Sequence, residues 1–297
     1  MIVKRMNRWP VLLALMPLFA ACGGGAEQET LTVDDQSTAT QEERMRKTKK
    51  IFYNIPSPME TAGLLKDAGA DYDGKILNDV KNVDRYTSAS KQALNLGVYG
   101  ADLSYASVFN HTQESMFYTS CSKKLADKLG VSHAFNDSTI EVMQKNQNDR
   151  EALLDVISET YWSVDAYLKE NDRENISALM VTGGWVEGLY IATQVAAVKA
   201  TPELRQRIAE QKLSLNHLSG LLNSYTTPDP ALDAARADVE KLTAVFADVE
   251  LPMGDGGTTE ENGVTVVGGT APAATLTDAQ LAAIRETVTA IRNNYIN

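Results

Sequence analysis

Apolar residues recur at intervals of three and four from Ile51 onward, which is the spacing of helices buried on one face. Residues 149–170 carry the clearest stripe, made of Leu153, Ile157, Tyr161, Val164 and Leu168. Patterns that alternate every second residue, as strands require, are nearly absent. We therefore predict an all-α fold, a bundle of about eight to ten helices whose short loops make neighbours antiparallel.

Start and stop signals divide this pattern into segments. Thr201-Pro202 and Asp229-Pro230 each pair a capping residue with a first-turn proline, which predicts a helix start at both places. Ser138 with Glu141, and Thr277 with Gln280, have the spacing of a capping box. Two long helices are expected at about 88–110 and 112–129, the second ended by Gly130.

Glycine and proline interrupt the helical pattern once, between residues 252 and 275. Val264 to Val267 is a short β-prone piece directly after Asn262-Gly263, so either a small hairpin or an irregular surface loop is expected. We expect a helical domain at 47–251, this Gly/Pro-rich loop at 252–275, and a C-terminal helix at 276–297 that docks on the bundle.

Two segments, 94–107 and 180–193, share a pattern of glycine, aromatic residue and small-residue face. Their likeness leaves open whether the domain consists of two related halves. Glycine inside a helix costs about 0.5–1 kcal/mol relative to alanine, so these glycines need a reason. Small residues spaced by four let helix backbones approach closely, which predicts two central helices that cross tightly.

The same two segments supply the candidate ligand-binding residues. Asp102 and Glu187 are acids in apolar surroundings, and buried carboxylates are unfavourable unless they are paired. The aromatic neighbours of the two acids are Tyr99, Tyr105, Trp185 and Tyr190. Together they can bind an amine, a sugar or a peptide, or the two acids can accept purely structural hydrogen bonds. Residues 176–198 are long enough to span a bilayer, but three glycines and Glu187 favour a buried central helix.

The first 21 residues have the form of an export signal. Lys4, Arg5 and Arg8 precede an apolar run that is too short to cross a membrane. The run ends in the sequence LFAAC, which resembles the lipobox of bacterial lipoproteins, with Phe19 where that family usually has leucine. The resemblance implies cleavage before Cys22, acylation of Cys22 and a covalent lipid anchor to the membrane.

Composition sharpens this interpretation. Residues 22–46 are rich in glycine, threonine and acids with few large apolar side chains, and we expect them to be a flexible tether. The first 21 residues hold three of the 28 basic residues and none of the 39 acidic ones, so the remainder has a formal charge of -14. Strong acidity argues against nucleic acid as a partner.

Recognisable catalytic chemistry is missing from the sequence. The three histidines, His111, His133 and His217, have no metal-binding spacing, although His111 and Glu114 can share a helix face. We interpret Cys121 as a small buried hydrophobic residue. Motifs for a nucleophile elbow, a phosphate loop or a dinucleotide site do not occur. We therefore predict no catalytic residues, no metal and no cofactor.

The strings FYNIPSPMETAGLL and LNLGVYGADLSYASVFNHTQESMFY resemble segments of an uncharacterised group of exported proteins from Bacteroidota. The resemblance covers about residues 51–130 and implies a cell with two membranes. Gly23 follows Cys22 where enteric lipoproteins of the inner membrane have aspartate, which favours the outer membrane; its periplasmic and outer faces both stay open.

These observations lead to one main hypothesis and two alternatives. The main hypothesis is an envelope lipoprotein whose non-catalytic helical domain binds a partner protein or supports assembly. The first alternative is a lipoprotein that binds a small amine, sugar or peptide between the two glycine-rich helices. The second is an envelope hydrolase that uses an Asp–Glu pair from separate helices.

Overall fold

Helices make up most of the chain in the computed structural model, which describes residues 55, 58–146, 149–251, 258–261, 264–267 and 274–297. The predicted all-α bundle is confirmed, with nine α-helices in these residues. The helices are α2 (Pro58–Asp67), α3 (Ala89–Val108), α4 (Thr112–Leu129), α5 (Asp137–Lys145), α6 (Arg150–Glu170), α7 (Glu174–Val198), α8 (Pro202–Ser224), α9 (Pro230–Phe246) and α10 (Asp278–Ile296). Two short 3-10 helices, Gly74–Ile76 and Val80–Arg85, connect α2 to α3.

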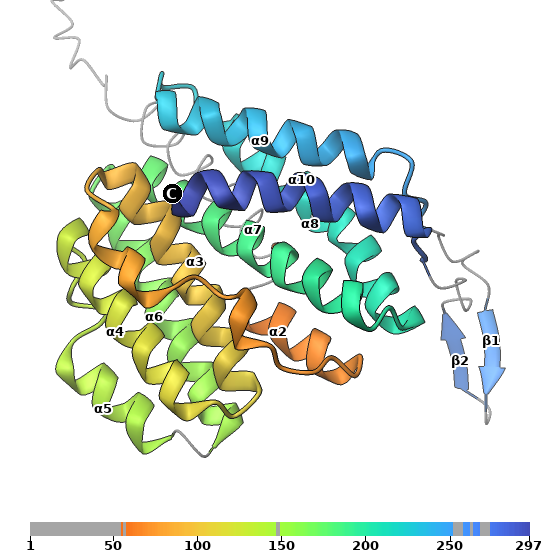
Figure 1. The fold of residues 1–297 in the computed structure, drawn as a ribbon, viewed down its shortest axis with the longest axis horizontal. Coiled ribbons are helices and arrows are strands. Elements are labelled where there is room, and N and C mark those ends of the chain that lie inside the picture. Colours follow the sequence, from red (N-terminus) through yellow and green to blue (C-terminus); the bar gives the residue numbers. More distant parts are fainter. Residues whose placement is uncertain (1–54, 56–57, 147–148, 252–257, 262–263, 268–273) are drawn as a thin grey trace, which may run out of the picture. The chain divides into compact units, whose positions relative to one another are not determined.

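Helices α3 and α7 form the centre of the bundle and pack against each other more extensively than any other pair in the described chain (Figure 1). Helices α2 and α4 lie on α3, and α6 contacts both central helices. On the other side, α8, α9 and α10 pack on α7 and on one another, so the C-terminal helix closes the core. Helix α5 packs on α6 at the periphery.

Glycine makes the α3–α7 crossing possible, as the small-residue pattern predicts. A Cβ atom on Gly97 would lie 2.0 Å from the carbonyl oxygen of Met180. One on Gly183 would lie 1.9 Å from the carbonyl oxygen of Leu94. Both distances are far below van der Waals contact and both neighbours are backbone atoms, so any larger residue would push the helices apart.

The other small residues of these helices serve different neighbours. A Cβ on Gly100 would lie 2.5 Å from the ring of Tyr161, so Gly100 makes room for α6 rather than for α7. Gly188 faces Thr61 of α2 at an ordinary distance of 3.6 Å. The small residues of α3 and α7 therefore contact not only each other's helix but also α6 and α2.

Most of the predicted helix ends are confirmed. The hydroxyl of Thr201 accepts a hydrogen bond from the first turn of α8, and the carboxylate of Asp229 does so for α9. Thr277 and Gln280 form the expected capping box at the start of α10. The capping box predicted at Ser138 is wrong, because the side chain of Asn136 caps α5 two residues earlier, with its Oδ1 atom accepting from the N–H of Thr139.

Strands β1 (Thr258–Glu261) and β2 (Val264–Val267) lie in the segment where the sequence left a hairpin or a loop open. They pair in antiparallel register, with Glu261 opposite Val264. Within the described ranges no helix combines the length and the apolar character that crossing a membrane requires. The expected signal at 1–21 and tether at 22–46 lie outside the described residues, and both stay predictions.

Candidate functional site

The two acids singled out from the sequence meet in the centre of the bundle. Asp102 of α3 and Glu187 of α7 are both fully buried, and Arg292 of α10 reaches them. Arg292 binds Glu187 through two hydrogen bonds, from Nε to Oε2 at 2.9 Å and from Nη2 to Oε1 at 3.0 Å. Such a two-point contact is among the strongest ion-pair geometries. It ties the last helix of the chain to the central one.

Asp102 has fewer partners than Glu187. The N–H of Asn78 donates to its Oδ2 atom at 3.2 Å, whereas no donor reaches Oδ1. Burial raises the pKa of Asp102 well above its usual range, and the neighbouring Glu187 carboxylate raises it further. Burial also raises the pKa of Glu187. The Arg292 guanidinium opposes both shifts, through its charge alone at Asp102 and through its charge and hydrogen bonds at Glu187. We therefore assign the proton of this pair to Asp102, which leaves one carboxylate facing one guanidinium.

Tyr190 completes this charged cluster. The guanidinium carbon of Arg292 lies 4.4 Å from the centre of the Tyr190 ring, within the range of a cation–π interaction. The structure thus brings together three of the six residues predicted from the sequence, Asp102, Glu187 and Tyr190, around Arg292. Arg292 was not predicted from the sequence, although it follows Ile284 and Val288 at helical spacing on the apolar stripe of the last helix, which is a signal for a buried partner.

The other three predicted residues use their polar atoms elsewhere in the fold. Tyr99 donates its hydroxyl to the carbonyl of Asp79 at 2.9 Å, and Trp185 donates its indole N–H to the hydroxyl of Ser214 at 2.9 Å. The hydroxyl of Tyr105 donates to the carbonyl of Asp71, also at 2.9 Å.

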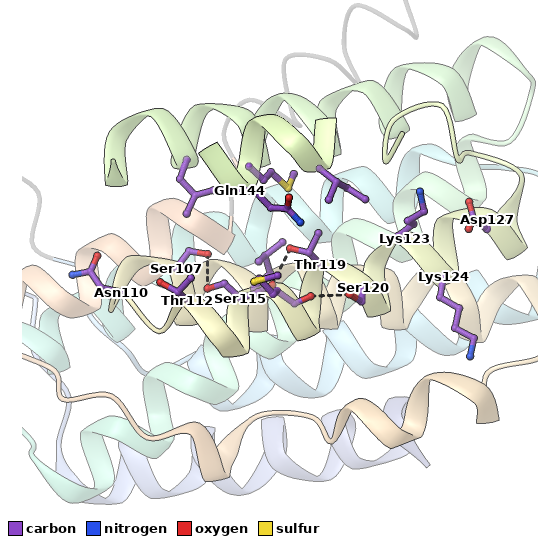
Figure 2. A pocket seen from close by; sticks show the side chains of 15 residues that line it. Ser107, Asn110, Thr112, Ser115, Thr119, Ser120, Lys123, Lys124, Asp127 and Gln144 are labelled. Carbon is purple, nitrogen blue, oxygen red and sulfur yellow. Dashed lines mark hydrogen bonds between the residues drawn. The ribbon is translucent and has the colours of Figure 1, made fainter. Parts of the chain in front are cut away.

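A cavity lies between α4 and α5, on the far side of α3 from α7, and is called the α4–α5 cavity below. None of the six predicted residues lines it. This cavity has a volume of about 240 Å³, and side chains from α3, α4, α5 and α6 line it. Figure 2 shows Thr119, Lys123 and Gln144 on the side of the space between α4 and α5, whereas Lys124 points away from it. The apolar part of its wall consists of Leu103, Met116, Ile140, Met143 and Leu153. An apolar wall combined with a few polar groups is typical of small-molecule sites.

Hydroxyl groups form another part of the wall (Figure 2). They come from α4 at helical spacing, because Thr112, Ser115 and Thr119 share one face of that helix, and from Ser107 at the end of α3. Serine and threonine inside a helix commonly donate back to a carbonyl four residues earlier. Ser115 does so to His111 at 2.9 Å and Thr119 does so to Ser115 at 2.8 Å.

Two of the three other hydroxyls in the lining, those of Ser107 and Ser120, also use their donors within the protein. Ser107 donates to the hydroxyl of Ser115 at 3.1 Å, and Ser120 donates to the carbonyl of Met116 at 2.9 Å. A hydroxyl group has a single donor and two acceptor positions. These four side chains therefore present acceptors, and no donors, to the cavity. This row was not predicted from the sequence, although serines and threonines at helical spacing in residues 112–120 are its signal.

Lysines mark the other end of the cavity. Lys123 of α4 donates to the carboxylate of Asp137 of α5 at 2.9 Å, which joins the two walls at that end. Lys124 pairs with Asp84 at 2.7 Å. Hydrogen bonding to the lysine lowers the pKa of both aspartates. The two ends of the cavity thus differ, with acceptors at one and paired charges at the other.

The remaining candidate chemistry is separate from this cavity. Cys121 is buried, and burial raises the pKa of its thiol to about 11, as suits a packing residue. His111 stacks on Tyr72 with ring centres 3.6 Å apart and lies 3.7 Å from Glu114. In the part of the chain that the structure describes, no three His, Cys, Asp or Glu side chains are grouped to hold a metal ion.

Comparison with protein-family models, with curated proteins and with solved structures finds no match to this chain. Its function is therefore inferred from the geometry of the chain itself.

Proposed function

We propose that this protein is a lipid-anchored envelope protein whose helical domain binds a small, partly apolar molecule in the α4–α5 cavity, without catalysis. The observation that carries the proposal is the cavity itself, which combines apolar side chains with a row of acceptor hydroxyls. The candidate site thus moves from the α3–α7 contact, where the backbones touch, to the outer side of α3.

The membrane part of the proposal rests on the leader around Cys22. Attached acyl chains give stable anchoring when two or more are present. Metabolic labelling with a radioactive fatty acid tests it: the wild-type chain should take up label and Cys22→Ser should not. Label that persists in Cys22→Ser would overturn the anchor without affecting the cavity.

Ligand binding can be tested with 1-octanol as the probe, because the cavity is of suitable size. An apolar cavity of about 150 Å³ holds the six carbons of benzene. By the same ratio, 240 Å³ holds about nine or ten non-hydrogen atoms. Met116 and Met143 line the cavity, whereas Met180 lies at the α3–α7 crossing. Their methyl groups are therefore local reporters in NMR spectra of the full chain in lipid nanodiscs.

Added 1-octanol should shift the Met116 and Met143 methyl signals in a saturable manner and leave Met180 unchanged. Ile140→Trp, which fills the cavity from α5, should abolish the shifts. Leu213→Trp is the matched control, since Leu213 is 56% exposed on α8 and does not line the cavity. Wild-type signals that do not move, or shifts that survive in Ile140→Trp, would overturn the proposal. An unchanged Met180 signal shows that each variant is folded.

Partner binding is the second candidate function, because two large apolar side chains are exposed next to the cavity. Met116 is 47% exposed and Phe117 is 49% exposed on α4. Exposed apolar groups that lie together commonly mark a contact with another protein. Cross-linking in the native envelope should then yield a product with the wild-type chain that Phe117→Ser loses and Leu213→Ser retains. The same product from Phe117→Ser would remove this candidate.

The hydrolase alternative lacks support from the geometry. A hydrolase needs its carboxylates where a substrate can reach them. Asp102 and Glu187 are each 0% exposed and lie outside the cavity lining. We do not propose it.

A further inference from the structure

We propose that the α4–α5 cavity selects a primary amine with an aliphatic body of about nine non-hydrogen atoms. This inference rests on the proposed function and names the chemical class of its ligand. It follows from three features of the cavity, namely the direction of its hydrogen bonds, its apolar wall and its balance of charges.

The direction of the hydrogen bonds decides which polar group fits. Four hydroxyl groups of the lining each donate their single O–H hydrogen bond to another protein atom. They belong to Ser107, Ser115, Thr119 and Ser120. Their remaining lone pairs face the cavity or solvent and accept hydrogen bonds. A carboxylate or phosphate consists of acceptors and finds no partner in this row. An amino group offers up to three N–H donors, which match several acceptors spaced along one helix face.

The apolar wall determines the chemical nature of the part of the ligand that lies outside its amino group. Leu103 is 1% exposed, Met143 is 5% exposed and Leu153 is 7% exposed, and these buried side chains line the cavity from α3, α5 and α6. A sugar would bring hydroxyl groups against this wall and lose hydrogen bonds to water there. An unbranched aliphatic chain loses none and buries its own surface.

Charge does not oppose a cation in this cavity. The charged side chains that line the cavity are Lys123, Lys124 and Asp127, and the two lysines pair with Asp137 and Asp84, which lie outside the lining. The lysines are therefore compensated and offer an anion little net attraction. Beyond the cavity, the formal charge of -14 for residues 22–297 attracts cations rather than anions.

Three probes of equal chain length test this inference: octylamine, 1-octanol and octanoate. All three have eight carbon atoms, one of which is the carboxylate carbon in octanoate, but the amine offers several donors, the alcohol one and the carboxylate none at neutral pH. Binding is followed through the Met116 and Met143 methyl signals of the full chain in nanodiscs. Free probe is measured by dialysis, because each probe also enters the lipid. Salt at about 0.3 M screens non-specific attraction to the acidic surface.

The expected order of affinity is octylamine, then 1-octanol, then octanoate, with the amine at least about tenfold tighter than the carboxylate. Thr119→Val keeps the shape of the side chain and removes one acceptor, so it should weaken octylamine by about 3- to 10-fold. Thr160→Val is the matched control. Thr160 is buried on α6 and donates to the carbonyl of Val156 at 2.7 Å in the same way, but it lies outside the cavity lining.

The outcomes separate this inference from the proposed function. Octanoate binding most tightly would overturn the amine inference and leave the cavity a ligand site. Equal affinity of octylamine for wild type and Thr119→Val would also overturn it, since the acceptor row would then have no effect. If none of the three probes moves the Met116 and Met143 signals, the proposed function itself fails.

Discussion

The crossing of α3 and α7 and the cavity between α4 and α5 use small polar residues in opposite ways. At the crossing, glycines bring the two backbones into contact, and the charges beside it pair with one another. At the cavity, serines and threonines at the same helical spacing leave about 240 Å³ unfilled. Residue spacing alone therefore does not tell a packed contact from a site. What distinguishes them is whether a neighbouring helix lies against the small-residue face.

The largest effect is expected from adding one carbon at the crossing. Gly183→Ala places a Cβ atom 1.9 Å from the carbonyl oxygen of Leu94, a backbone atom that cannot turn away. Overpacking of a core commonly costs about 1–3 kcal/mol, and displacing a backbone should exceed that range. Urea unfolding of the variant should therefore show a large loss of stability.

Gly220→Ala is the control for this substitution. Gly220 lies in α8 with nothing within 4 Å of the added carbon, so alanine should be neutral or stabilising by up to about 1 kcal/mol. A Gly183→Ala protein as stable as Gly220→Ala would mean that the two central helices do not touch as described.

The next largest effect is expected from breaking the ion pair beside the crossing. Arg292→Met leaves the buried Glu187 carboxylate without its cation, and removing one partner of a buried pair costs about 3–5 kcal/mol. The double variant Glu187→Gln with Arg292→Met should recover much of that loss, because no buried charge is left uncompensated. Strictly additive losses in a double-mutant cycle would contradict the coupling.

The cluster also makes a prediction about pH. Burial raises the pKa of Asp102 in the folded state above its value in the unfolded chain, so the folded state holds this proton more tightly. The contribution of Asp102 to the stability of the fold is complete below the pKa that Asp102 has in the unfolded chain. It is lost as pH rises through the pKa that Asp102 has in the folded state. Exposed aspartates with lowered pKa values, such as Asp84, change stability in the opposite sense. The comparison must therefore be made between wild type and Asp102→Asn.

Asp102→Asn mimics the protonated form at every pH. Relative to wild type, it should gain stability as pH rises above about 4, by at most about 1.4 kcal/mol for each pH unit. Unfolding by urea at several pH values measures this difference. A stability difference that does not change with pH would show that Asp102 is ionised in the folded state.

The two regions also differ in how far the sequence reveals them. Apolar periodicity and helix caps predicted the bundle and most helix ends, because these depend on neighbours in the sequence. The glycines of segments 94–107 and 180–193 predicted the crossing, since a helix interior tolerates glycine only for a reason. The capping error at Ser138 is local too, because Asn136 is a comparably good cap.

The site depends on residues that are far apart in the sequence. Arg292 lies 105 residues from Glu187, so its pairing could not be read from local spacing. Four helices line the cavity. The sequence does not predict that α5 packs on α6 and leaves a space between α5 and α4. The hydroxyl row is visible in the sequence, but its meaning depends on that space.

The smallest effect is expected where extra carbon atoms enter the cavity instead of the crossing. Thr119→Val exchanges the hydroxyl for a methyl group of similar size, and Thr119→Ile extends that methyl by one more carbon toward the apolar wall. The lost hydrogen bond to the Ser115 carbonyl is worth about 0.5–1.5 kcal/mol, and the added apolar contact offsets about 0.8 kcal/mol for each buried methylene. Both variants should therefore unfold within about 1 kcal/mol of wild type in urea. One carbon would then be tolerated at Thr119 and not at Gly183, which is the difference between an open site and a closed contact. A loss at Thr119→Ile as large as that at Gly183→Ala would show that the α4–α5 space is already filled.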